Sequence, residues 1–270
     1  MLKIRKKKTA LAIGVMGLFI SFICFVHLDA YDMKLYRSMQ DEIRSTERVD
    51  LTGLREIQAS GGYLPRFPTL ARKLRQIKEN KVIVNAEDEL TQYVKGLPIT
   101  LLGYGNPAPS LKYYIRRLVF TGTLKERPDL IASEDREAKR YGFIYKNLVI
   151  GSRFSVPDQN IDDIVAFFDE YADNSWIHFH CTHGKGRTSM LLAMLDIIKN
   201  APNVALKDII RRQRLLRSVD LADTVIWLNG GYTKEMLENR KRFIEDFYSF
   251  VCQRKAGGIQ RWSEWKANTK

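Results

Sequence analysis

The sequence predicts an α/β protein preceded by an apolar N-terminal helix, and three observations support this fold class. Helical apolar spacing over 67–80 is followed at once by an apolar strand at 81–85. A strand at 177–180 leads through a glycine-rich loop into a helix at 189–200. Residues 9–28 contain no Asp, Glu, Lys or Arg. Such alternation is typical of a central, mostly parallel sheet that is flanked by helices.

The first element in the chain, residues 1–30, is predicted to be a signal peptide or a membrane anchor. Five cations between Lys3 and Lys8 precede an apolar run of about 20 residues. The run is long for a signal peptide, and 28–30 (Leu-Asp-Ala) is a weak cleavage site, which favours an uncleaved anchor. The positive-inside rule keeps the Lys cluster cytoplasmic. We therefore expect the remainder to lie in the cell envelope, membrane-anchored or secreted, with the membrane as a partner of this segment.

The rest of the chain is divided by its composition. Residues 31–48 are polar and read as a linker, 49–256 as one domain, and 257–270 as a tail that begins with two glycines. Trp262 and Trp265 lie three positions apart and are expected to clamp this tail onto the domain. Further strands are predicted at 97–102 and 143–150, and further helices at 160–171 and 232–254, by the same periodicity. A helix after the loop is also predicted to carry the basic residues between Lys207 and Arg217.

Charge and cysteine content restrict the function. The net charge is +13, and the N-terminal cluster supplies five of these charges, so the body still carries about +8 and favours an anionic partner. Cys24, Cys181 and Cys252 cannot form a disulfide framework, because Cys24 lies in the apolar run. No metal-ligand spacing and no dinucleotide fingerprint occurs, so no cofactor is expected. Nucleic-acid binding would rest on charge alone and is not expected.

The loop between the strand at 177–180 and the following helix has the composition of an anion site. Backbone N–H groups at a helix N-terminus converge on an anion, and glycines at 184 and 186 allow the chain to wrap tightly. Cys181 would lie at the base of this site, where a positive potential favours the thiolate, which is the nucleophilic form. Arg187 can fold back over the loop and hold two phosphoryl oxygens with its planar guanidinium.

The run from His180 to Thr188 resembles the C-x5-R-T loop of the cysteine-dependent phosphatases, which include the protein tyrosine and dual-specificity phosphatases. This resemblance implies the PTP-like fold and a two-step reaction without a metal. Cys181 would attack phosphorus, and water would then hydrolyse the thiophosphoryl enzyme. Thr188 would hydrogen-bond the Cys181 sulfur and ease its departure. The positions implied to line the phosphate site are Thr182, His183, Gly184, Lys185 and Gly186.

A finer resemblance extends over most of the chain after Val49, and most densely over 144–213. The order of Pro157, Ile161-Asp162 and the run 176–181 (Trp-Ile-His-Phe-His-Cys) is similar to the bacterial PTP-like inositol polyphosphatases, or phytases. The resemblance implies inositol phosphates as substrates. Lys185 gives a Cys-x-x-Gly-Lys-Gly-Arg pattern that is similar to the phosphoinositide 3-phosphatases, and together with Arg153 it predicts a pocket for a multiply phosphorylated small molecule.

The general acid departs from the phytase pattern. Those enzymes carry an Asp in a Thr-Asp-His sequence, and alignment of the neighbouring residues places Gly151 at that position. Loss of a proton donor for the leaving oxygen typically costs 10²- to 10⁴-fold. Asp158, on the same loop, is the nearest replacement, with Asp162 and Asp163 behind it, although Asp158 could equally be an ordinary residue at the start of a helix.

Two alternatives to an inositol phosphatase stay open on this reading. One is a protein tyrosine or dual-specificity phosphatase that acts on a phosphoprotein. The other is a catalytically inactive phosphate-binding module, which the missing Thr-Asp-His acid would explain. Gln213 could position the hydrolytic water. The basic residues after the loop could line the substrate pocket or form a solvated face: Lys207, Arg211, Arg212, Arg214 and Arg217.

Overall fold

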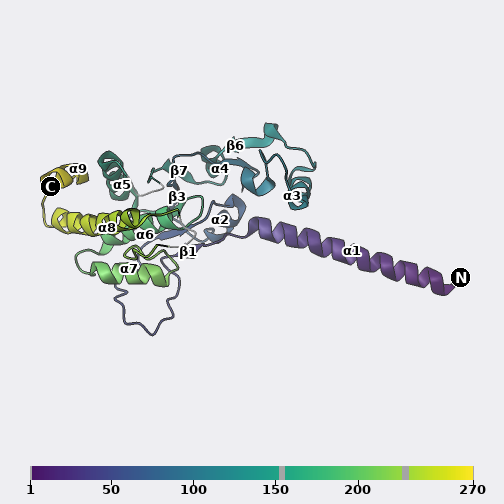
Figure 1. Cartoon of the computed structure of the whole chain (residues 1–270), viewed down its shortest axis with the longest axis horizontal. Helices are drawn as coiled ribbons and strands as arrows, with labels where there is room; N and C mark the ends of the chain where they lie inside the picture. Colours follow the sequence, from purple (N-terminus) through teal and green to yellow (C-terminus); the bar gives the residue numbers. More distant parts are fainter. Residues whose placement is uncertain (1, 152–155, 227–230, 270) are drawn as a thin grey trace.

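The computed structural model describes residues 2–151, 156–226 and 231–269. A long N-terminal helix, α1 (Leu2–Tyr31), extends away from a body in which helices cover a central sheet (Figure 1). The remaining helices are α2 (Phe67–Lys73), α3 (Leu111–Thr121), α4 (Glu134–Arg140), α5 (Asp158–Tyr171), α6 (Gly186–Asn200), α7 (Leu206–Leu215), α8 (Lys234–Lys255) and α9 (Trp262–Asn268).

The central sheet is mixed. Its order is β1-β2-β8-β3-β7, with all neighbours parallel except β1, which runs antiparallel to β2 at the edge. A smaller antiparallel sheet has the order β5-β4-β6. The strands of the central sheet are β1 (Arg37–Ser38), β2 (Ala59–Gly62), β3 (Asn80–Asn85), β7 (Ile144–Asn147) and β8 (Ser175–His180), and those of the smaller sheet are β4 (Gln92–Val94), β5 (Leu97–Pro98) and β6 (Ile131–Ser133).

The strand β8 lies in the middle of the sheet and is buried along its whole length. Ile177 pairs with Ala59 of β2 on one side and with Val82 of β3 on the other. A parallel strand that is covered on both faces buries its polar residues too, which is why the alternation seen in the sequence does not lead to an exposed face here. The helix that follows, α6, is also buried on most of its surface and packs against α7, α8 and β2.

Some predicted elements have different bounds in the structure. The strand at 81–85 is confirmed, and the helix at 189–200 begins three residues earlier, at Gly186. The strand predicted at 97–102 ends at Pro98, because residues 99–102 turn into a 3-10 helix that closes on Gly103 at φ +66°. The helix predicted over 67–80 ends at Lys73, since pairing with β8 draws the chain into β3 from Asn80 onwards.

The two ends of the chain are attached to the body in different ways. Trp262 of α9 is 2% exposed and packs edge-on against Phe250, with ring centroids 5.7 Å apart. The predicted tryptophan clamp is therefore confirmed, and α9 lies against α5 and α8. At the other end, Asp29 of α1 forms ion pairs with Lys112 and Arg116 of α3.

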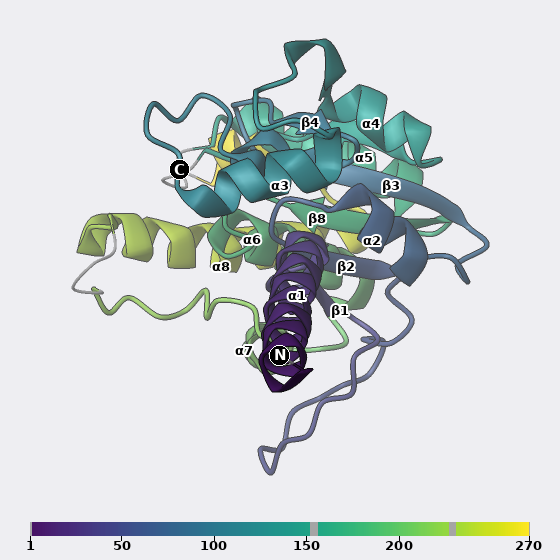
Figure 2. The ribbon, with the colours of Figure 1, turned by 90° about the vertical axis from the view of Figure 1, so that its right-hand side faces the viewer.

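The apolar part of α1, Ile13–Tyr31, is long and apolar enough to cross a membrane, with a mean hydropathy of 2.0 and only 13% of that window buried. Figure 2 looks along this helix, and Figure 1 shows that it extends away from the sheets. A cleaved signal sequence would meet the same criteria of length and composition. Directly after α1, residues expected to be a linker supply β1, the edge strand of the central sheet.

Candidate active site

Cys181 follows the last residue of β8 and lies at the base of the loop that leads into α6. Its thiol is 2% exposed. The Thr188 hydroxyl donates to its Sγ at 3.2 Å and also lies 3.4 Å from the Gly62 carbonyl oxygen, at the end of the neighbouring strand β2. Because Thr188 is on the first turn of α6, the helix places this hydroxyl beside the sulfur.

The loop wraps tightly over the end of β2. Gly184 has φ +63°, and a Cβ at this position would overlap the backbone of Gly62 and Tyr63, so only glycine fits. Its N–H donates to the Cys181 carbonyl oxygen at 3.2 Å. Gly186 begins α6, while His183 and Lys185 are exposed at the surface of the loop. The loop therefore presents a helix N-terminus and an exposed cation beside a buried thiol.

Arg187 folds back toward the end of β3, where it meets Glu87. Its Nη2 lies 2.8 Å from Glu87 Oε1, and the exposed fractions of the two side chains are 16% and 5%. The same oxygen accepts hydrogen bonds from the N–H and the hydroxyl of Thr182. A carboxylate is thus present where the loop donors converge.

Arg37 of β1 lies beneath the loop and is 1% exposed. Its Nη1 donates to the Gly184 carbonyl oxygen at 2.9 Å, its Nη2 to Ser189 Oγ at 3.0 Å, and its Nε to Ser218 Oγ at 2.9 Å. Burial lowers the pKa of Arg37 to about 10, and the attraction of an ionised Cys181 acts in the opposite direction. The guanidinium therefore braces the loop and places a positive charge near the sulfur.

A second buried network supports His180, the residue before the cysteine. Its Nε2 lies 3.0 Å from Glu134 Oε1 of α4. The Glu134 carboxylate also accepts hydrogen bonds from Tyr93 OH at 2.8 Å and from Asn85 Nδ2 at 2.9 Å. Burial, followed by the charge of Glu134, raises the pKa of Tyr93 well above its usual value, so this hydroxyl remains a donor. These contacts connect the small sheet to the end of β8.

Comparison with known proteins agrees with this geometry. Residues 124–199, which include the cysteine loop, match the sequence model of the PTP-like phytases. That family is described by the compound inositol hexakisphosphate. This segment, which holds the cysteine loop, resembles the PTP-like phytases. The uncharacterised protein AvrBs1.1 of Xanthomonas campestris is 33% identical over 96 residues, which cover 36% of this chain and 92% of that protein. Phosphatases of this family are phosphoric monoester hydrolases.

Two solved structures share the fold. The PTP-like myo-inositol phosphatase from Mitsuokella multacida, in complex with myo-inositol-(1,3,4,5)-tetrakisphosphate, gives a TM-score of 0.67 at 22% identity. The match covers 87% of this chain and 47% of that one, so this chain spans about half of its length. A PTP-like phytase from Bdellovibrio bacteriovorus gives a TM-score of 0.61 at 21% identity, with 87% and 90% of the two chains covered.

The candidate general acid Asp158 lies at the first turn of α5 and accepts a hydrogen bond from Trp262 Nε1 of α9 at 2.7 Å. Asp162 is likewise bound to α9, through Ser263. Asp163 is exposed and contacts Gln159. Among the described residues, the groups that contact these three carboxylates belong to α5, to α9 and to Arg261 just before α9, and none belongs to the cysteine loop. Arg153, predicted to bind substrate, lies outside the described residues.

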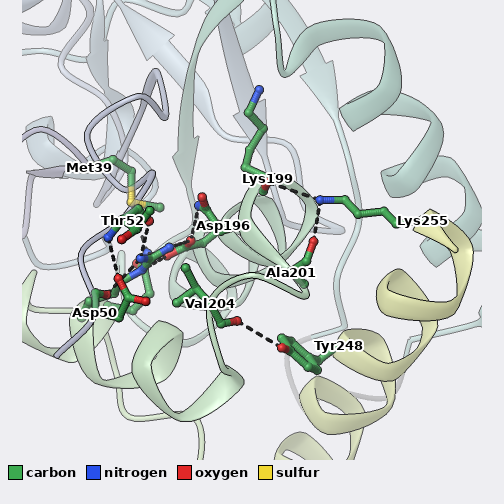
Figure 3. A network of polar contacts seen from close by, with 12 residues as sticks. Met39, Asp50, Thr52, Asp196, Lys199, Ala201, Val204, Tyr248 and Lys255 are labelled. Carbon is green, nitrogen blue, oxygen red and sulfur yellow. Dashed lines mark hydrogen bonds and ion pairs between the residues drawn. The ribbon is translucent and has the colours of Figure 1, made fainter.

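The basic residues of α7 were predicted either to line the substrate pocket or to form a solvated face. Neither description holds for all of them. Arg212 is fully buried and hydrogen-bonds Asp196 of α6, with additional bonds to backbone oxygens of Asp50 and Thr52 (Figure 3). Gln213 is 2% exposed, and its amide donates to Asp196 and not to the cysteine loop. At the surface, Arg214 pairs with Glu47 at 2.9 Å.

Glu87 and Arg37 were missed because no local pattern identifies them. Glu87 is 100 residues from Arg187, and Arg37 is 147 residues from Gly184. The available signal for Glu87 was its place just after a predicted strand, since the carboxyl ends of parallel strands meet at one edge of the sheet. Arg37 had no such signal, because it comes from a two-residue strand within the expected linker.

Proposed function

We propose that this chain is a cysteine-dependent phosphatase that hydrolyses phosphomonoesters through a thiophosphoryl enzyme on Cys181. The observation that carries the proposal is the buried thiol of Cys181, which accepts a hydrogen bond from the Thr188 hydroxyl at 3.2 Å. This thiol lies at the base of the loop, over which the Arg187 side chain folds back toward Glu87. A nucleophile, a guanidinium and a helix N-terminus at one point are what transfer of a phosphoryl group requires.

In the first step, the Cys181 thiolate attacks phosphorus, an S–P bond forms, and the bond from phosphorus to the leaving oxygen breaks. Arg187 and the loop N–H groups neutralise the charge on the non-bridging oxygens. In the second step, water attacks phosphorus, phosphate forms, and the S–P bond breaks. The hydroxyl of Thr188 donates to the departing sulfur, which makes the thiolate a better leaving group.

Inositol phosphates are the proposed substrates. The match of residues 124–199 to the phytase model supports this choice, and so does the tetrakisphosphate bound to the Mitsuokella protein. Lys185 is exposed in the loop, and the chain without its N-terminal cluster carries about +8, so a ring that carries several phosphates would meet complementary charge. A phosphorylated tyrosine, with one phosphate on a flat ring, would make less use of these cations.

A catalytically inactive phosphate-binding module is the second candidate, because the contacts of Asp158 are with α9 and leave the leaving oxygen without an assigned proton donor. Such a module would bind phosphate in the same loop. It would not release phosphate from esters whose leaving group needs a proton.

The experiment measures phosphate release by the full chain in detergent from inositol hexakisphosphate, a phosphotyrosine peptide and an activated aryl phosphate. We expect release from the inositol ester, and its loss in Cys181→Ser, because serine is a far weaker nucleophile at neutral pH. Cys252→Ser, at the end of α8, is the matched control and should keep full activity. Unchanged hydrolysis by Cys181→Ser would refute the nucleophile. Release only from the peptide would favour a tyrosine phosphatase. Phosphate binding without turnover would favour the binding module.

We also propose that α1 anchors the chain in a membrane with the body outside the cytosol. Its large apolar side chains between Ile13 and Phe22 are exposed, and the basic cluster precedes them. Digestion of the body by protease added to intact cells is the expected result, and its protection would place the body in the cytosol.

A further inference from the structure

The donors of the cysteine loop already hold an anion that belongs to the chain itself. Oε1 of Glu87 accepts from the N–H and the hydroxyl of Thr182 and from Arg187 Nη2, the last at 2.8 Å. This side chain is 5% exposed. One carboxylate oxygen therefore gathers three donors, two of them from groups that the proposed reaction assigns to the phosphoryl group.

The position of Glu87 is fixed by its backbone. Its N–H donates to Asn85 Oδ1 at 3.0 Å, and its carbonyl oxygen accepts from Asn147 Nδ2 at 3.0 Å. Asn85 is itself held by Glu134, the buried partner of His180. Glu87 is thus part of the same framework that supports the residue before Cys181, and its contact with the loop is not that of a loose surface side chain.

A carboxylate and a phosphoryl dianion compete for part of this donor set. The Thr182 N–H is a single donor, whereas the Arg187 guanidinium has five N–H donors and contacts Glu87 through Nη2. Two anions at one point in a largely buried site also repel strongly. We propose that Glu87 is the resident anion of the loop: its carboxylate occupies part of the phosphoryl position in the free protein, keeps Arg187 folded over the loop, and is exchanged for the phosphoryl group when substrate binds. This inference rests on the proposed function, because it concerns the same site.

The exchange has a consequence for affinity. A ligand that binds only the open loop has its apparent affinity reduced by the fraction of molecules in which Glu87 has moved away. Glu87 would therefore keep the loop ordered without substrate and would exclude weakly bound anions. Removal of its charge should strengthen binding of every phosphoryl ligand by a similar factor.

The test compares wild type with Glu87→Gln, which is nearly the same size and loses only the charge. Inorganic phosphate is the probe, as a competitive inhibitor of aryl phosphate hydrolysis and as a ligand in calorimetry. We expect phosphate to bind about tenfold more tightly to the variant. The state in which residue 87 occupies the loop competes with phosphate, and in the variant it lacks the hydrogen bonds to a charged carboxylate. Asp88→Asn is the matched control, because Asp88 is the next acidic residue and is exposed.

The outcomes separate this inference from the proposed function. Equal or weaker phosphate binding by Glu87→Gln, with wild-type turnover intact, would overturn the resident anion alone. A fall in kcat with little change in phosphate binding would do so as well, and would make Glu87 a residue that positions Arg187. Equal tightening in Asp88→Asn would show that only the general charge of the segment matters and would also overturn it. If the wild type neither binds phosphate nor hydrolyses any ester, both proposals fail.

Discussion

Two buried arginines that contact α6 differ in how their charge is compensated. Arg212 lies between α6 and the segment around Asp50, where Asp196 accepts its Nε at 2.9 Å and backbone oxygens take the remaining donors (Figure 3). Arg37 is equally buried, but within the part of the chain that the structure describes its hydrogen bonds go to neutral oxygens, and no carboxylate forms an ion pair with it.

The difference shows which arginine serves the fold and which serves the site. A buried ion pair such as Arg212 with Asp196 is neutral as a unit and acts as a fixed polar contact. A buried cation without a carboxylate is costly, and burial accordingly lowers the pKa of Arg37 to about 10. That cost is opposed by the attraction of Arg37 to an ionised Cys181, so the charge is available to the nucleophile.

The largest effect on stability is expected from Arg212→Met. This change leaves Asp196 buried without its cation, which typically costs about 3–5 kcal/mol in the free energy of unfolding. Urea denaturation measures the loss. The double variant Arg212→Met with Asp196→Leu removes both charges and should recover most of it, whereas no recovery would mean that the pair has no special role.

Arg37→Met should instead reduce activity. Loss of a preorganised positive group beside a reacting atom typically lowers kcat by about 10²- to 10³-fold. We expect a smaller loss of stability than in Arg212→Met, because no buried carboxylate is left without its cation. Steady-state kinetics measure the fall in kcat, and urea denaturation measures the stability.

Controls for Arg37 test the comparison itself. Arg37→Lys keeps the charge but not the three-way set of hydrogen bonds, and should have intermediate activity. If Arg37→Met lowered stability as much as Arg212→Met and left kcat unchanged, Arg37 would be a second structural arginine.

The smallest effect concerns His178, which lies on β8 and hydrogen-bonds Ser60 at 2.9 Å. Burial, then His180 and then Arg37, lower its pKa well below 6.5. Below pH 6.5 the unfolded chain binds a proton that the folded chain excludes. The free energy of unfolding therefore decreases by about 1.4 kcal/mol for each pH unit of acidification, until the pH reaches the pKa of His178 in the folded protein. Unfolding at pH 7.5 and 5.5 should show this loss. His178→Gln should reduce this pH-dependent loss of stability. Arg37→Met should reduce it more than Arg212→Met does, because Arg37 contributes to the low pKa of His178.

Local signals were sufficient for part of the fold and site. The spacing from His180 to Thr188, its glycines and the strand and helix beside it identified the candidate nucleophile and the architecture around it, because these residues are contiguous. Helix and strand bounds failed where tertiary pairing prevailed, as at β3, which begins where an amphipathic helix was still expected. The tryptophan clamp was recognisable because two large aromatic residues in a polar tail need an apolar partner.

The sequence by itself determined the α/β class, the cysteine loop, the apolar N-terminal helix and the family resemblance, because each depends on residues that are close together in the chain. Only the tertiary structure decided that Asp158 contacts Trp262, that Glu87 meets Arg187, and that Arg37 of a two-residue edge strand lies under the loop. These contacts join residues about 100 or more positions apart. They depend on the order of strands in the sheet and on which helix covers which face, and no local spacing encodes that order.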